Sequence, residues 1–206
     1  CRKKDLSLAN NEQPPEKTEV EVAEEATESA QEDDAVALAM IVVGDSNGNP
    51  IFDEEAARHP NLTADHAYVD ATALWMVQKP WDFDVMVTEN MFGDILSDLG
   101  AGLMGGLGLA PSADIGLHQA VFQPCHGSAP DIAGEGKANP FAMILSAAMM
   151  LEWLGTKHAI AAMLDDAAKI RTAVDAAVAN KTSVTADLGG SSTTSQAAAA
   201  IELAVT

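Results

Sequence analysis

The sequence predicts an α/β protein that follows a disordered, acidic N-terminal tail. Short runs rich in β-branched residues alternate with longer amphipathic runs, as strands and helices do in α/β folds. Aromatic residues make up only 4% of the chain, which suits helices packed on a sheet better than an aromatic-rich β-sandwich. Residues 1–34 are acidic and poor in large apolar side chains, a composition typical of a solvated tail.

The local pattern places the elements along the chain in a definite order. Strands are predicted at the short apolar or β-branched runs: AVALAMIVV (35–43), Tyr68-Val69, FDVMVTEN (83–90) and the start of AVFQPCHG (120–127). Helices are predicted at the longer periodic runs: one ending at Pro60, one ending before Pro80, GDILSDLGAGLMGGL (93–107), FAMILSAAMMLEWLG (141–155) closed by Gly155, 157–180, and a last helix ending at Val205. The turn formers of GDSNGNP (44–50) predict a loop.

Charge and cysteine content exclude some classes of function. The formal net charge is −20, so the chain lacks the lysines and arginines with which proteins displace counterions from nucleic acid. No run reaches the roughly 18 apolar residues of a membrane-spanning helix. The two cysteines, Cys1 and Cys125, make no disulfide framework and suit a reducing compartment such as the cytoplasm.

The segment GAGLMG (100–105) matches the dinucleotide-binding pattern G-x-G-x-x-G. That pattern binds a pyrophosphate only when a strand precedes the first glycine and a helix follows the last one. Here the glycines follow a helical pattern, and no ribose-binding acid comes about 20 residues later on a second strand. We therefore interpret them as a helix end packed tightly against another backbone.

Asp94 and Asp98 are spaced so that both carboxylates lie on one face of a helix. The helix follows a predicted strand, so the pair would lie at the carboxyl edge of a sheet, where α/β proteins bind ligands. Two converging carboxylates favour a hard cation, Mg²⁺ or Mn²⁺, between them. Two surface acids on a solvated helix face are an equal alternative on spacing alone.

The loop HGSAPDIAGEGKANP (126–140) combines a histidine, a serine and an aspartate with many small residues. The small residues allow a backbone to approach a ligand closely, and Asp131 can accept hydrogen bonds from a diol. An ordinary surface loop with a satisfied histidine is the alternative.

Segments in this order resemble the isocitrate/isopropylmalate dehydrogenase family: NMFGDILSD, GSAPDIAGEGKANP, ILSAAMMLEWLG and DLGGSSTTS. The likeness is greatest to its isopropylmalate and tartrate dehydrogenase branches, covers 51–206, and is not found in 1–50. It implies the C-terminal half of that family's α/β fold, in a homodimer with a shared active site. The implied parts are an acidic low-complexity tail and linker (1–50), a remnant of the smaller, dimer-forming, metal-binding domain (51–104) and the C-terminal part of the larger nucleotide-binding domain (105–206).

The resemblance also implies two binding sites. Mg²⁺ or Mn²⁺ is expected at acids of the YVD and GDxxxD segments, the first of them contributed across the dimer interface: Asp70, Asp94 and Asp98. The adenosine end of NAD is expected on the long loop: His126, Gly127, Ser128, Ala129, Pro130, Asp131, Ala138 and Asn139. An acid at Asp131 implies NAD in preference to NADP, because a carboxylate repels a 2′-phosphate.

The implied reaction is NAD-dependent oxidation of a 2-hydroxy acid with loss of its β-carboxylate, as in leucine biosynthesis. The family uses a lysine base, a tyrosine acid and substrate-binding arginines, none of which is identified here. The one tyrosine, Tyr68, lies in the YVD segment, and GDSNGNP (44–50) stands where the lysine is expected. We therefore expect little turnover by this chain alone. A tartrate- or malate-type dehydrogenase, a non-catalytic metal- or NAD-binding partner subunit, and a non-functional remnant are the alternatives.

Overall fold

The computed structural model describes residues 39–44, 50–181 and 183–206. Contacts divide the chain into two compact units: the described parts of Cys1–Tyr68 with Trp81–Thr88 form unit 1, and Val69–Pro80 with Glu89–Thr206 forms unit 2. The predicted acidic tail and most of the predicted loop at 44–50 lie outside the described residues. The α/β class is confirmed, since strands and helices alternate along the chain.

Unit 1 is built around a three-stranded parallel sheet in the order β2-β1-β3. Its elements are β1 (Ala39–Gly44), α2 (Pro50–Ala56), β2 (Thr63–Tyr68), η1 (Pro80–Asp82, shared with unit 2) and β3 (Val85–Thr88). Phe52 of α2 is buried against Leu62, Val85 and Val87, and this packing holds the helix on the sheet. The strand predicted in FDVMVTEN is present, but it is only half-buried because it lies at an edge of the sheet.

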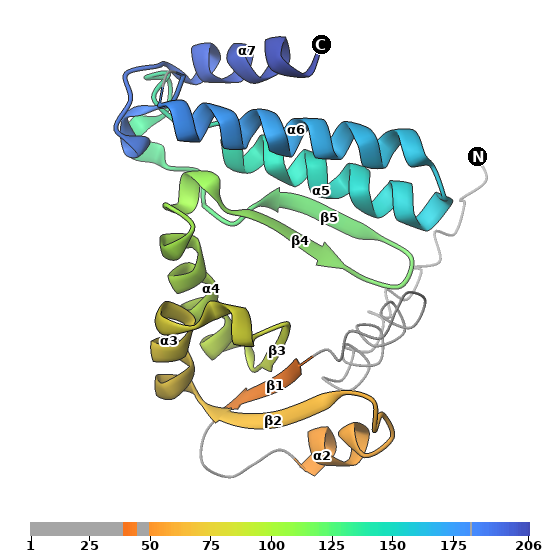
Figure 1. The fold of residues 1–206 in the computed structure, drawn as a ribbon. Coiled ribbons are helices and arrows are strands. Elements are labelled where there is room, and N and C mark those ends of the chain that lie inside the picture. The colour runs from red at the N-terminus through yellow and green to blue at the C-terminus, as the bar shows by residue number, and fades with distance from the viewer. Residues whose placement is uncertain (1–38, 45–49, 182) are drawn as a thin grey trace, which may run out of the picture. The chain divides into compact units, whose positions relative to one another are not determined.

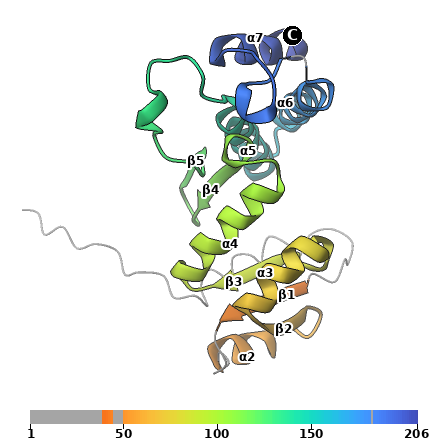
Figure 2. The same ribbon diagram turned by 90° about the vertical axis from the view of Figure 1, so that its left-hand side faces the viewer.

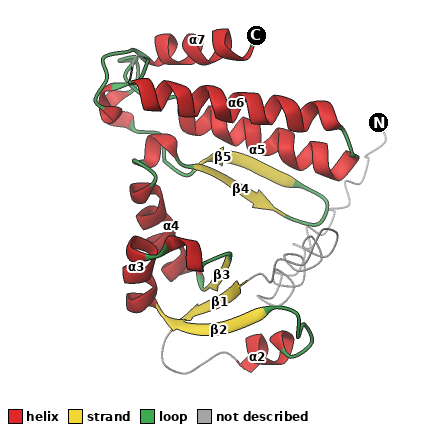
Figure 3. Ribbon diagram, viewed as in Figure 1, coloured by secondary structure: helices red, strands yellow, loops and turns green. Residues whose placement is uncertain are grey.

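Unit 2 consists of helices and a two-stranded antiparallel hairpin, shown by element type in Figure 3. Its helices are α3 (Val69–Gln78), α4 (Asn90–Leu103), α5 (Phe141–His158), α6 (Ala161–Asn180) and α7 (Thr194–Val205). Its strands are β4 (Pro111–Ile115) and β5 (Ala120–Pro124), and its short 3₁₀ turns are η2 (Leu107–Leu109), η3 (Pro130–Ile132) and η4 (Ala186–Leu188). Helices α5 and α6 lie side by side, and α5 covers the hairpin (Figure 1).

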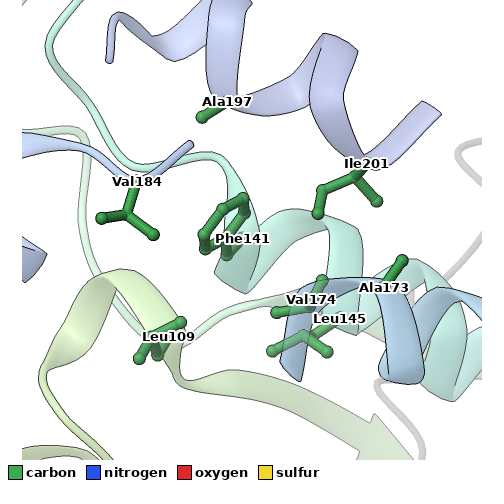
Figure 4. Packing of buried hydrophobic residues seen from close by; sticks show 8 residues of the cluster. All are labelled: Leu109, Phe141, Leu145, Ala173, Val174, Val184, Ala197 and Ile201. Atoms are coloured by element: carbon green, nitrogen blue, oxygen red, sulfur yellow. The ribbon is translucent and has the colours of Figure 1, made fainter. Parts of the chain in front are cut away.

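The core of unit 2 surrounds the first turn of α5 (Figure 4). Phe141, the first residue of that helix, has no exposed surface. The cluster around it comes from η2, α5, α6, the segment before η4, and α7: Leu109, Leu145, Ala173, Val174, Val184, Ala197 and Ile201. Because Phe141 directly follows the loop 126–140, the core anchors that loop at its C-terminal end.

The prediction that a helix closes at Gly155 is wrong. Helix α5 continues to His158 and is capped by Ala159, whose φ of 53° lies in the left-handed region. A Cβ atom on Gly155 would lie 2.8 Å from Cδ2 of Leu164 on α6. This glycine therefore permits the close approach of α6 and does not end the helix.

The prediction that GAGLMG is not a strand-to-helix turn is confirmed. Gly100 and Gly102 lie inside α4, and Gly105 and Gly106 follow it. The expected tight packing against another backbone is not found: a Cβ atom on Gly102 would meet no atom within 4 Å, and one on Gly100 or Gly105 would meet only a side-chain atom, Met76 Cε at 3.6 Å or Leu109 Cδ1 at 3.1 Å. Glycine is required instead by the φ angles of 112° at Gly105 and 121° at Gly106.

Strand β4 was not predicted from the sequence. Its residues PSADI have little intrinsic preference for a strand, and they are extended because they pair with β5 in the register Pro111↔Pro124 to Ile115↔Ala120. None of the helices in the described part of the chain is long and apolar enough to cross a membrane.

Candidate metal and nucleotide site

Helix α4 carries the predicted carboxylate pair. It begins two residues after strand β3, and it buries Leu96 and Ala101 while Asp94 and Asp98 remain exposed. Neither carboxylate has a hydrogen-bond or ion-pair partner among the described residues. Two unpartnered carboxylates one helical turn apart repel each other, and a shared divalent cation would remove that repulsion. The donor set present therefore fits part of a site for Mg²⁺ or Mn²⁺.

Asp70 is not brought together with this pair in one chain. It lies in the first turn of α3, is exposed, and accepts a hydrogen bond of 2.8 Å from the backbone N–H of Ala71. In the described ranges no group of three or more His, Cys, Asp or Glu side chains is placed to hold a metal ion. Its contribution across a dimer interface stays a prediction.

Asp98 lies close to the start of the long loop. Cys125 follows β5, and its backbone N–H donates to the carbonyl of Ala110 at 3.2 Å. Partial burial raises the pKa of the Cys125 thiol, and the nearby negative charge of Asp98 raises that pKa further. Asp98 is therefore within electrostatic range of Cys125, the residue that precedes His126 in unit 2.

Unusual backbone conformations shape the loop, which arcs outward between β5 and α5 in Figure 2. Ala129 has a φ of 45°, in a left-handed region that costs a non-glycine residue about 1–2 kcal/mol. Gly134 and Gly136 adopt φ angles of 79° and 65°. The glycines of this loop are therefore needed for its path.

Two side chains of the loop are available to a nucleotide. His126 is half-buried, and its Nδ1–H donates to the carbonyl of Gly127 at 2.9 Å, which leaves Nε2 as the acceptor of the neutral ring. Asp131 lies in η3, is exposed, and has no hydrogen-bond or ion-pair partner in the part of the chain described. Its oxygens are free to accept hydrogen bonds from the hydroxyls of a ribose.

The C-terminal end of the loop is tied to the segment before α7. Asn139 Nδ2 donates to a carboxylate oxygen of Asp187 at 2.9 Å. The backbone N–H of Thr194 donates to the carbonyl of Gly136 at 2.8 Å, and its hydroxyl donates to the carbonyl of Ala138. Neither Asp187 nor Thr194 was a predicted site residue, although both belong to the DLGGSSTTS segment.

Comparisons with known proteins identify the family to which the chain is similar. The family model described as isocitrate/isopropylmalate dehydrogenase matches residues 16–203. The homoisocitrate dehydrogenase of Methanocaldococcus jannaschii is 53% identical over 136 residues, which are 66% of this chain and 37% of that protein. The 3-isopropylmalate dehydrogenase of Methanothermobacter thermautotrophicus is 49% identical over 150 residues, which are 73% of this chain and 43% of that protein.

A solved structure from the same family has a similar fold. The crystal structure of isocitrate dehydrogenase from Methylococcus capsulatus matches with a TM-score of 0.76 and 41% identity, over 90% of this chain and 54% of that one. The chain thus spans 37% and 43% of the length of the two curated relatives. Since the family match begins at residue 16, the expectation of no likeness before residue 51 is wrong.

Proposed function

This chain belongs to the isocitrate/isopropylmalate dehydrogenase family of oxidatively decarboxylating dehydrogenases, and we propose that it serves the NAD-dependent oxidative decarboxylation of a 2-hydroxy acid. 3-Isopropylmalate, the substrate of leucine biosynthesis, is the first candidate, because a relative that is 49% identical carries that name. Homoisocitrate, named for a relative that is 53% identical, and tartrate or malate are the other candidates.

The observation that carries the proposal is the proximity of Asp98 to Cys125, at the start of the long loop. An unpartnered carboxylate pair near a loop with a free ribose acceptor supports the proposal, because an enzyme that transfers hydride from a chelated alcohol to NAD needs both features together. A structural helix face would not require its carboxylates to lie near a loop with strained backbone.

The two sides of the site have different tasks. Asp94 and Asp98, with Asp70 of the partner subunit, would hold Mg²⁺ or Mn²⁺. A bound cation supplies Lewis-acid polarisation of the hydroxyl and carboxylate oxygens of the substrate. Asp131 would bind the ribose hydroxyls of NAD and repel the 2′-phosphate of NADP.

We propose further that this chain alone contributes binding groups and no proton-transfer groups. Its one tyrosine, Tyr68, lies at the end of β2 in the YVD segment, and no lysine lies in GDSNGNP (44–50). A homodimer of longer subunits, or a pair with a subunit that supplies the missing groups, would complete the site. The same observation favours the second candidate function, a non-catalytic metal- and NAD-binding subunit.

Binding and turnover measured separately test these statements. Isothermal titration of the full chain with Mn²⁺ and with NAD should show binding of each, with Mn²⁺ binding lost in Asp94→Asn and NAD binding retained there. Incubation with Mn²⁺, NAD and isopropylmalate, tartrate, malate or isocitrate should then form little NADH. Absence of both binding signals would contradict the proposed function, and robust NADH formation would contradict only the assignment of missing proton-transfer groups.

A further inference from the structure

We propose that Asp187 is a positioning residue for the nucleotide: through Asn139 it holds the C-terminal end of the loop 126–140 in its binding shape. The inference rests on the proposed NAD site. It gives a role to the DLGG part of the DLGGSSTTS segment, which contributes no residue to the proposed metal and NAD sites.

The carboxylate of Asp187 has two partners. One oxygen accepts the hydrogen bond from Asn139 Nδ2 at 2.9 Å, and the other accepts one from the hydroxyl of Thr185, a residue with no exposed surface. Because a carboxylate only accepts hydrogen bonds, it requires the NH₂ group of Asn139, and not the carbonyl oxygen, to face it.

That orientation couples Asn139 to the core. Its Oδ1 is turned toward the backbone N–H of Phe141 and accepts a hydrogen bond of 2.9 Å from it. Phe141 is the fully buried first residue of α5 (Figure 4). Both ends of the Asn139 amide are thus engaged, and this residue of the predicted adenosine site is fixed against the buried core of unit 2.

The chain around Asp187 is itself held tightly. Gly189 has a φ of 80°, and the backbone N–H of Gly190 donates to the carbonyl of Thr185 at 3.0 Å. A Cβ atom on Gly190 would lie 2.0 Å from the carbonyl oxygen of the buried Val184. Gly190 thus has no room for a side chain, Gly189 adopts a conformation that favours glycine, and the turn they make presents Asp187 to the loop.

A second glycine contact shows how closely this region is packed. A Cβ atom on Gly108 would lie 2.7 Å from Asp187 Oδ2 and 2.8 Å from Asn139 Cβ. A methyl group there would push the two side chains away from their present places. Gly108→Ala thus perturbs the same pair without removing any hydrogen-bonding group.

The loop is also held by hydrogen bonds that do not involve Asp187. Thr194, the first residue of α7, bonds to the carbonyls of Gly136 and Ala138. Thr193 and Gln196 form a capping box that fixes the start of α7. Loss of Asp187 should therefore loosen the Asn139 end of the loop while α7 and its bonds keep the chain folded.

The test combines NAD titration with hydrogen exchange in the full chain. We expect Asp187→Ala and Gly108→Ala each to weaken NAD binding by about tenfold, because each variant loses one charge-assisted hydrogen bond between Asp187 and Asn139. The affinity for Mn²⁺ should be unchanged in both variants. Hydrogen exchange should increase in 127–139 and stay unchanged in α6. Asp187→Asn keeps one acceptor oxygen for Asn139 and should bind NAD within about threefold of the parent.

Matched controls separate this effect from a general loss of charge or of glycine. Glu202→Ala removes an exposed acid from α7, and Gly102→Ala adds a methyl group where a Cβ atom meets nothing within 4 Å. Both should bind NAD normally. Unchanged NAD affinity in Asp187→Ala, or faster exchange in the loop with unchanged affinity, would overturn the inference alone. No NAD binding by the parent chain would overturn the proposed NAD site and the role of Asp187 with it.

Discussion

Replacement of Phe141 by alanine should cost unit 2 a large part of its stability. Phe141 has no exposed surface and lies among Leu109, Val184 and Ile201. Truncation of a fully buried phenylalanine removes its transfer free energy and leaves a cavity, which together cost about 3–5 kcal/mol. The free energy of unfolding of a domain is typically about 5–15 kcal/mol, so the loss is readily measured.

Urea unfolding followed by far-ultraviolet circular dichroism is the assay, because every α-helix except α2 in the described part of the chain belongs to unit 2. Ile201→Val removes one methylene from the same cluster and should cost about 0.5–1.5 kcal/mol. Met143→Ala is the matched control on α5, since this residue is 54% exposed and its loss should change stability by no more than about 0.5 kcal/mol. Equal midpoints for Phe141→Ala and Met143→Ala would refute the assignment of the core.

Other variants test separate parts of the account. In a Cys1→Ser background, Asp98→Asn should lower the pKa of Cys125, so iodoacetamide should alkylate this thiol faster near neutral pH. An unchanged dependence of the alkylation rate on pH would mean that Asp98 is not close to Cys125. Gly102→Ala should raise the free energy of unfolding by about 1 kcal/mol, because a methyl group replaces hydrogen inside α4 without a steric contact, and a lower urea midpoint would contradict this. Asp131→Asn should weaken NAD binding and strengthen NADP binding in parallel titrations, whereas the same loss for both dinucleotides would show that Asp131 does not face the ribose.

Features that depend on neighbours in sequence could be predicted. The spacing of Asp94 and Asp98 defines one helix face in any α-helix, and α4 places both side chains there, exposed. The rejection of GAGLMG as a dinucleotide turn also followed from local order, since its first glycines continue a helical pattern. The path of 126–140 as a long loop followed from its glycines and prolines.

Features that depend on distant parts of the chain could not be predicted. Asn139 and Asp187 are 48 residues apart, and nothing in either segment indicates that their side chains meet. Strand β4 is defined by its pairing with β5 and not by its own residues. Gly155 suggests a helix end by composition, but the tertiary contact with Leu164 decides its role.

The central claim is that the carboxylate pair of α4 and the loop 126–140 form one site. The most direct measurement is the proton relaxation rate of NAD bound to the full chain, with and without Mn²⁺, in the parent and in an Asp94→Asn, Asp98→Asn double variant. We expect Mn²⁺ to accelerate the relaxation of NAD protons in the parent, and we expect the double variant to lose this acceleration while it still binds NAD. Relaxation that Mn²⁺ leaves unchanged, or an acceleration that persists in the double variant, would contradict this claim.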